Sequence, residues 1–185
     1  EILVKEAVRL VNALGISSPS ILDLCTGSGC IATAIAKNLS FAKVVASDIS
    51  APAMRYAIEN AGLNSAGNLV FVQGDLFEPV RGQSFHLIVS NPPYVKGDDL
   101  MGLQQEVSWY EPPEALDGGR DGLDFYRRIL KAVPRYLRDG GYLVLELGLG
   151  QGIAVGEIAG ECGLRVLRVL NDLSDIERVM VLEKV

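Results

Sequence analysis

The chain has 185 residues, of which 49% are hydrophobic and 22% are charged, and its formal net charge is −6. This length allows a single domain with a substantial core, and the acidic balance argues against a nucleic-acid partner, which usually requires a basic surface. No apolar run reaches the roughly 18 residues of a membrane span, and three cysteines without a CxxC pair argue against a disulfide framework or a zinc site and favour a reducing cytoplasm.

The apolar pattern in the first half of the chain predicts helices that alternate with strands. Helices are expected over 3–14, 30–39 and 52–60, and strands over 21–25, 42–49, 68–75 and 85–91. The connection 75–85 is too short for a helical crossover between parallel strands, so a loop is expected there.

The second half predicts a helix over 123–138, in which Pro134 should cause a kink or a lost hydrogen bond. A strand over 141–148, a helix over 151–161 and two closely spaced strands over 165–172 and 178–184 follow. Because the last two strands have no room for a crossover between them, they should pair antiparallel. We therefore expect a single α/β domain over residues 1–185, with a mostly parallel seven-stranded sheet, an antiparallel last strand and helices on both faces.

Residues 92–122 interrupt this scheme, because they contain many prolines and glycines and show little periodicity. Loops of this length within a compact domain are usually functional or disordered. Trp109 and Tyr110 provide apolar anchors, so a substrate-facing loop insertion is favoured over a flexible one. Five basic side chains on the helix that follows are interpreted as a solvated face, with an acidic partner as the alternative: Arg127, Arg128, Lys131, Arg135 and Arg138.

Two glycines, Gly27 and Gly29, stand between the first strand and the helix after it, where they let the backbone turn sharply and approach a ligand. Read as Gly-x-Gly-x-x-Ala, with Asp48 about 20 residues on, the segment matches a dinucleotide-binding fingerprint. Read as acid-x-x-x-Gly-x-Gly, with Asp23 as the acid, it matches the loop under the methionine half of S-adenosylmethionine. The glycine pair alone is compatible with both ligands.

Two carboxylates end the next strands. Asp48 can accept hydrogen bonds from both ribose hydroxyls of either nucleotide, or it can cap the following helix. Asp75 can accept from an adenine amino group while Leu76 packs on the ring, or it can serve as a turn residue. Because ligands of open α/β sheets lie at the carboxyl ends of the strands, these residues and Asn91 are expected to form one site.

Asn91, Pro92, Pro93 and Tyr94 follow the fourth strand and are similar to the catalytic signature of methyltransferases that modify planar nitrogen. A planar amide is a poor nucleophile, but the Asn91 side-chain oxygen and the Pro92 carbonyl can each accept one of its N–H groups and orient the nitrogen at the methyl group. Tyr94 can pack against the planar target. The prolines stiffen the segment, and a simple edge turn is the alternative.

The signature is shared by methyltransferases of DNA adenine, RNA guanine and protein glutamine. Three segments resemble the peptide-chain release factor glutamine methyltransferases of the HemK type: LQQEV (103–107), YEPPEALDGGRDGLDFYRRIL (110–130) and NDLSDIERVMVLEK (171–184). The resemblance runs through essentially the whole chain. A sister group that acts on a ribosomal protein shares part of the pattern, but LQQEV and ALDGG favour the release-factor group. A nucleic-acid amine methyltransferase, a non-catalytic cofactor-binding module and a nicotinamide enzyme are the remaining alternatives.

The resemblance implies the Rossmann-like fold of S-adenosylmethionine-dependent methyltransferases. The expected methyl acceptor is the glutamine of the Gly-Gly-Gln loop of a class-1 release factor, and the expected products are N5-methylglutamine and S-adenosylhomocysteine. The resemblance implies the following cofactor-binding residues: Cys25, Thr26, Gly27, Ser28, Gly29, Asp48, Asp75, Leu76 and Asn91. It also implies a substrate site at Asn91, Pro92, Pro93 and Tyr94, with Asn91, Pro92 and Tyr94 catalytic.

Two departures from the family pattern are visible. Cys25 stands where the wider methyltransferase pattern prefers glycine, and a small side chain is expected to fit there. Family members usually carry a small N-terminal helical domain that helps to dock the release factor, whereas this chain begins near the expected start of the methyltransferase domain. We expect this chain to be that catalytic domain, as a monomer without a metal, a membrane or a stable nucleic-acid partner.

Overall fold

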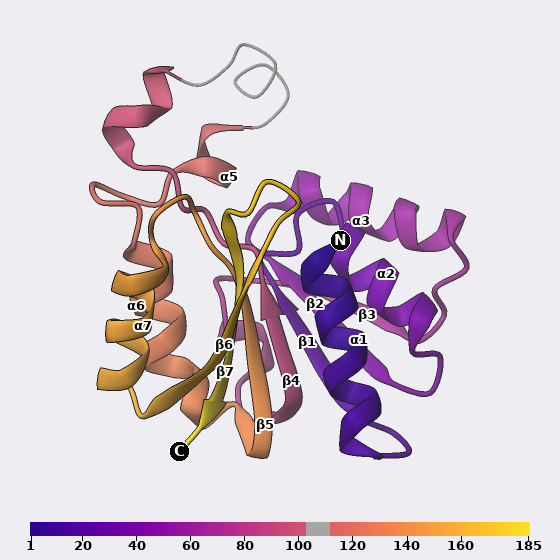
Figure 1. The fold of residues 1–185 in the computed structure, drawn as a ribbon. Coiled ribbons are helices and arrows are strands. Elements are labelled where there is room, and N and C mark those ends of the chain that lie inside the picture. Colours follow the sequence, from indigo (N-terminus) through magenta and orange to yellow (C-terminus); the bar gives the residue numbers. More distant parts are fainter. Residues whose placement is uncertain (103–111) are drawn as a thin grey trace.

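The computed structural model describes residues 1–102 and 112–185, and Figure 1 shows a central sheet between two layers of helices. The strands are β1 (Ser20–Leu24), β2 (Lys43–Asp48), β3 (Leu69–Gln73), β4 (Phe85–Ser90), β5 (Leu137–Glu146), β6 (Leu164–Asn171) and β7 (Glu177–Lys184). They form one seven-stranded sheet in the order β3-β2-β1-β4-β5-β7-β6.

The sheet is parallel from β3 to β5, and β7 runs antiparallel to both of its neighbours, β5 and β6. This confirms the predicted mostly parallel sheet with an antiparallel last strand, and the predicted pairing of the last two strands. The strand order reverses next to β1, which lies between β2 and β4. Ligands of open α/β sheets bind at such a reversal, beyond the carboxyl ends of the strands.

Helices cover both faces of the sheet. On one face lie α1 (Ile2–Leu14), α2 (Cys30–Asn38) and α3 (Ala51–Leu63), and on the other lie α6 (Asp124–Ala132) and α7 (Gly152–Glu161) (Figure 1). Ile21 and Leu22 are adjacent on β1 but belong to the two opposite apolar clusters, because successive side chains of a strand point to opposite faces. A strand buried on both faces therefore reads as a continuous apolar run. None of the described helices is long and apolar enough to cross a membrane.

The predicted helix over 123–138 is wrong in its second half. The helix α6 ends at Ala132, a 3-10 turn η3 (Val133–Arg135) follows, and β5 begins at Leu137. Pro134 has no N–H to continue the helix, and the Tyr136 N–H closes a turn on the Val133 carbonyl at 2.9 Å. Leu137 fits the helical stripe by spacing, yet it is buried as a strand residue paired with Phe85. The connection 75–85 is a loop, as predicted, with a 3-10 turn η1 (Glu78–Val80) in it.

The segment 92–122 leaves the sheet after β4, and its last residues fold back onto its first residues. It contains η2 (Gly97–Gly102) and α5 (Pro113–Leu116), while LQQEV (103–107), Trp109 and Tyr110 lie outside the described residues. Its two ends are joined by main-chain hydrogen bonds: Val95 N–H to Leu116 O at 2.9 Å, Gly118 N–H to Val95 O at 2.8 Å and Gly97 N–H to Gly119 O at 2.9 Å. The hydrogen bonds that close this segment, called the excursion below, therefore begin directly after Tyr94.

Candidate active site

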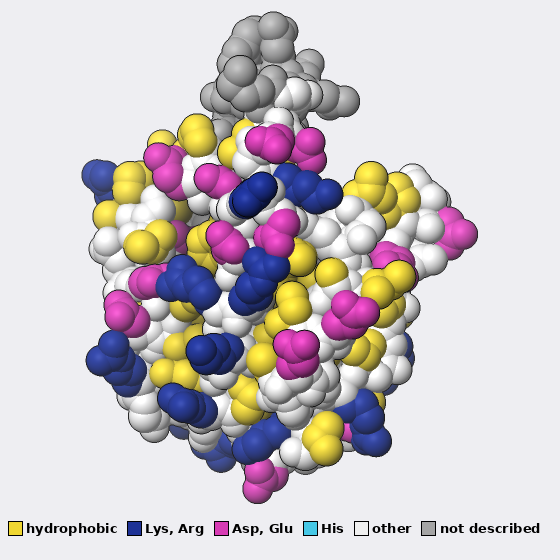
Figure 2. Space-filling model, turned by 90° about the vertical axis from the view of Figure 1, so that its left-hand side faces the viewer, with side chains coloured by type: hydrophobic (Ala, Val, Ile, Leu, Met, Phe, Trp, Pro, Cys, Tyr) yellow, Lys and Arg dark blue, Asp and Glu magenta, His cyan; other side chains and the backbone are white. Residues whose placement is uncertain are grey.

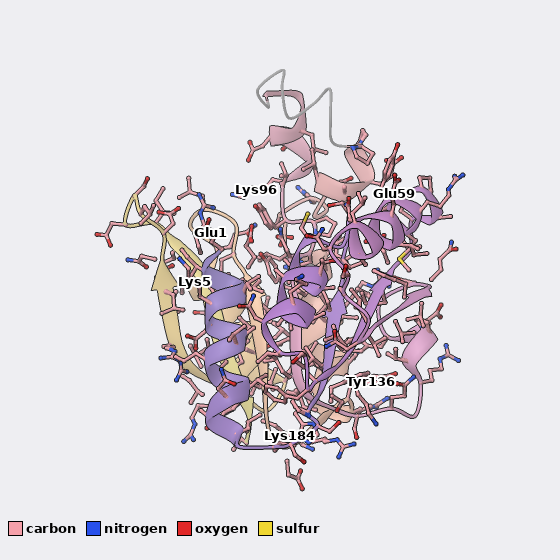
Figure 3. All side chains as sticks on the ribbon, turned by 90° about the vertical axis from the view of Figure 1, so that its right-hand side faces the viewer. Glu1, Lys5, Glu59, Lys96, Tyr136 and Lys184 are labelled. Atoms are coloured by element: carbon pink, nitrogen blue, oxygen red, sulfur yellow. The ribbon has the colours of Figure 1, made fainter. Side chains whose placement is uncertain are left out.

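The predicted site residues follow the carboxyl ends of four neighbouring strands. Leu24 of β1 pairs with Ser90 of β4, so Cys25 and Asn91 leave the sheet side by side. Asp48 ends β2, and its carbonyl accepts the Gly74 N–H at 3.0 Å, which places Asp75 close by. Figure 3 shows Lys96 at the end of the molecule where these segments lie, whereas Tyr136 and Lys184 lie toward the opposite end.

The loop after β1 is built from left-handed backbone. Cys25 has φ 57°, Gly27 φ 55° and Gly29 φ 77°. A Cβ on Gly29 would lie 2.9 Å from the Ala57 Cβ on α3, so glycine is needed there for close approach as well as for its backbone angle. The positive φ of Cys25 explains why glycine is favoured at this position in the wider pattern.

Asp48 is held by main-chain donors of this loop. Its Oδ2 accepts the Gly27 N–H at 2.8 Å and its Oδ1 accepts the Ser50 N–H at 2.9 Å. The first turn of α3 is capped instead by Ser50, whose Oγ accepts the Ala53 N–H at 3.3 Å. Asp48 therefore does not act as the side-chain cap of α3. Each carboxylate oxygen retains a lone pair for a further donor, such as a ribose hydroxyl.

Asp23 lies beneath the same loop and is fully buried. Its Oδ2 accepts the Thr26 hydroxyl at 2.6 Å, while its Oδ1 has no hydrogen-bond partner among the described residues. Burial raises the pKa of Asp23 from 3.8 to about 7. From the sequence, Asp23 was predicted only as the first residue of a motif, although an acid inside an apolar strand is itself a signal of a site.

Asp75 and Leu76 follow β3. Leu76 is buried with φ 47°, and its neighbour Asp75 forms an ion pair with Arg128 of α6, with 2.5 Å between Oδ2 and Nη2. The Arg128 guanidinium also lies 5.6 Å from the centre of the Phe125 ring. The interpretation of the basic side chains as a solvated face is therefore incomplete, because Arg128 reaches the predicted adenine site. The pair leaves Asp75 Oδ1 for another donor.

The Asn-Pro-Pro-Tyr corner packs against β5 and the start of α7. Pro92 and Pro93 are buried, whereas Asn91 and Tyr94 are half-buried. The Tyr94 hydroxyl donates to Glu146 Oε1 at 3.3 Å, and the Tyr94 carbonyl accepts from Gln151 Nε2 at 3.0 Å. The corner thus combines a stiff backbone with an aromatic residue that is held at its hydroxyl and at its main-chain carbonyl.

Glu146, Tyr126 and Gln151 were missed by the sequence analysis. Burial raises the pKa of Glu146 and of Tyr94. The Tyr126 hydroxyl donates to the Glu146 carbonyl at 2.8 Å and accepts the Gly148 N–H at 3.2 Å. Glu146 could have been found as an acid that ends an apolar strand, as Asp48 does, but nothing local marks the other two side chains.

An open hollow of about 630 Å³ lies next to the corner. Its lining comes from the segment after Tyr94 and from the start of α6: Lys96, Asp98, Arg120, Asp121, Asp124 and Arg127. Figure 2 shows Lys or Arg and Asp or Glu side chains interleaved on this face of the molecule. No predicted cofactor residue lines the hollow, so it is distinct from the strand-end site.

The sequence matches the family model "Methyltransferase small domain" over residues 7–107. The chain is 46% identical over 184 residues to a protein of Thermodesulfovibrio yellowstonii named release factor glutamine methyltransferase, covering 100% of this chain and 66% of the relative. A protein of Geobacter sulfurreducens with the same name is 46% identical over 180 residues, covering 97% of this chain and 62% of the relative. A third relative with this name, from Fusobacterium nucleatum, is 38% identical over 185 residues, covering 100% of this chain and 52% of the relative. This chain thus spans between about half and two thirds of the length of these relatives.

Solved structures with a similar fold include a methyltransferase from Pyrococcus furiosus, with a TM-score of 0.69 and 17% identity over 97% of this chain and 81% of that chain. A magnesium protoporphyrin IX methyltransferase from Synechocystis with bound S-adenosylmethionine gives a TM-score of 0.66 and 16% identity, covering 98% of this chain and 78% of that chain. At these identities the likeness concerns the fold alone, and it confirms the predicted Rossmann-like methyltransferase fold.

Proposed function

Because this chain belongs to the methyltransferase small domain family, we propose that it transfers a methyl group from S-adenosylmethionine to a glutamine side-chain amide, that of the Gly-Gly-Gln motif in a class-1 release factor. The observation that carries the proposal is the pairing of Leu24 with Ser90, which sets a glycine loop and an Asn-Pro-Pro-Tyr corner side by side. The name shared by the curated relatives supports the choice of acceptor.

The residues at the strand ends fit this cofactor. Among the residues that the structure describes, a Cβ on Gly27 would meet no atom within 4 Å, which agrees with an open cradle above the loop. The Asp23 Oδ1, which has no hydrogen-bond partner among these residues, lies under it. In the proposal, residues 25–29 hold the methionine moiety, Asp48 accepts from the ribose, and Asp75 with Leu76 holds the adenine. The bound cofactor supplies an electrophilic methyl group on a sulfonium centre.

The corner supplies the acceptor side of the reaction. The Asn91 side-chain oxygen and the Pro92 carbonyl each accept one N–H of the target amide, which turns the nitrogen toward the methyl group and favours the positive charge that develops on it. Buried Pro92 and Pro93 keep that carbonyl from moving. Tyr94 packs against the planar amide. A general base is not required, since the methylated nitrogen is acidic enough to lose its proton afterwards.

Substitution of Asn91 separates binding from chemistry. Asn91→Ala should leave the affinity for S-adenosylmethionine, measured by calorimetry, within about threefold, because the other strand ends still hold the cofactor. Methyl transfer to a release factor should fall by at least about 10²-fold, the usual loss when a positioned hydrogen bond at a reacting centre is removed. Unchanged turnover would remove Asn91 from the mechanism. Methyl label on DNA or ribosomal RNA alone would contradict the proposed acceptor.

A further inference from the structure

One buried side chain connects the catalytic corner to the segment that returns to it. Gln151 precedes α7 and is only 6% exposed. Its Nε2 donates to the Tyr94 carbonyl at 3.0 Å and to the Gly122 carbonyl at 3.3 Å. A single primary amide therefore joins residues 91–94 to the loop 117–122.

Three glycines make this contact possible. A Cβ on Gly122, where φ is +77°, would lie 2.5 Å from both Gln151 Nε2 and the Tyr94 carbonyl oxygen. A Cβ on Gly118 would lie 2.7 Å from the Tyr94 Cα, and one on Gly148 would collide with the side-chain amide of Gln151. Such distances are far below ordinary contact, so the glycines allow Tyr94, Gln151 and the loop to pack without a gap.

The chain retains the amide of Gln151 at some cost. Among the described residues its Oε1 has no hydrogen-bond donor although it is buried, which is unfavourable for a polar atom. An apolar side chain of similar length would fill the same space without that penalty. The feature that an apolar side chain could not reproduce is the NH₂ group, which satisfies two main-chain carbonyls at once.

We propose that Gln151 is a positioning residue for methyl transfer. Its side chain holds Tyr94, and thereby the Pro92 carbonyl, against the loop 117–122. This role rests on the proposed function, because the corner is taken as the site of the acceptor amide. Misplacement of a reacting group by about 1 Å can cost about 10²-fold in rate, so a side chain that only holds the corner can still govern turnover.

The first test compares Gln151→Met, which keeps the length and removes the donor, with Gln83→Met. Gln83 is exposed and lies just before β4, at the opposite end of that strand from the corner. Gln151→Met should lower kcat for a release factor by at least about tenfold, with less than about a twofold change in the dissociation constant of S-adenosylmethionine. Gln83→Met should leave both values unchanged. A loss of thermal stability in Gln151→Met with kcat within twofold of wild type would overturn the role.

The second test uses Gln151→Glu over a range of pH. An ionised carboxylate has no donor for the two carbonyls, whereas the protonated acid regains one O–H. The kcat of Gln151→Glu, relative to wild type, should therefore rise as the pH is lowered, while the ratio for Gln151→Met should stay flat. A flat ratio for both variants would contradict a role through the donor.

A third readout needs no substrate. Amide hydrogen exchange at Val95 and Gly118, whose N–H groups close the base of the excursion, should be faster in Gln151→Met than in wild type. Equal exchange rates in Gln151→Met and wild type would contradict the proposal that Gln151 holds Tyr94 against the loop 117–122. If wild-type protein methylates no release factor, the proposed function fails, and the exchange comparison still decides whether Gln151 holds the corner.

Discussion

The guanidinium of Arg128 lies 2.5 Å from the carboxylate of Asp75, 53 residues away along the chain. The contact joins α6 to the end of β3, and it takes up one oxygen of the side chain proposed to accept from adenine. Both partners are partly exposed, with 48% and 36% of the side chains accessible. An ion pair of this kind contributes at most about 1 kcal/mol.

Arg128→Met should therefore weaken binding of S-adenosylhomocysteine by about two- to fivefold, because Asp75 loses the partner that orients it. Calorimetry at low and at high salt measures the effect, which should shrink as salt screens the pair. Arg135→Met, an exposed arginine just beyond α6, is the matched control and should bind as wild type does. A loss in Arg128→Met that does not depend on salt would contradict this explanation.

Cys25→Gly should raise the free energy of unfolding by about 1 kcal/mol, because glycine relieves a left-handed backbone at φ 57°. Cys162→Gly makes the same substitution at φ −91°, and it should lower that free energy by about 1 kcal/mol. Urea unfolding of the two variants measures both changes. Equal losses would show that backbone strain at Cys25 is negligible.

Gly122→Ala should destabilise the fold by about 2 to 4 kcal/mol and reduce methyl transfer, because its Cβ would overlap the contact between Gln151 and Tyr94. Gly82→Ala provides the control, since Gly82 has φ +80° and a Cβ there would meet no atom of the described part of the chain within 4 Å. That variant should lose only about 1 kcal/mol, from backbone strain alone, with normal turnover. Similar urea midpoints for the two variants would argue against tight packing around Tyr94.

Asp23 should make stability depend on pH. Its pKa is about 7 in the folded protein against 3.8 as the ordinary value. Between these values the unfolded chain is ionised and the native one is protonated, so the free energy of unfolding falls as the pH rises from about 4 to about 7, by on the order of 4 kcal/mol. Asp23→Asn should lack this decline in urea unfolding across the window. Parallel pH profiles for the variant and wild type would contradict a buried neutral Asp23.

The strand ends were predictable from sequence because each follows an apolar run, and parallel strands bring such ends to one edge. This reasoning predicted the positions of Asp48 and of Asn91 at strand ends, whereas the role of the Asn-Pro-Pro-Tyr corner came from its resemblance to a methyltransferase signature. Leu137 was misassigned because its spacing satisfies a helical stripe and a buried strand equally well, and only pairing with Phe85 decides between them.

Side-chain contacts between residues far apart along the chain were not predictable. The Arg128 and Gln151 contacts with Asp75 and Tyr94 span 53 and 57 residues, and no local periodicity records them. The Asp23 Oδ1, which has no hydrogen-bond partner within residues 1–102 and 112–185, likewise depends on the packing of the loop above it. The roles of Asn91 and Tyr94 toward an amide remain predictions.

Mass spectrometry of a class-1 release factor, after incubation with this protein and S-adenosylmethionine, tests the central claim most directly. If the Asn91 side-chain oxygen and the Pro92 carbonyl orient the glutamine amide, wild-type protein should add one methyl group to the glutamine of the Gly-Gly-Gln peptide. Asn91→Ala should leave that peptide unmodified. An unmodified peptide with wild-type protein, or a methyl group on another residue, would contradict it.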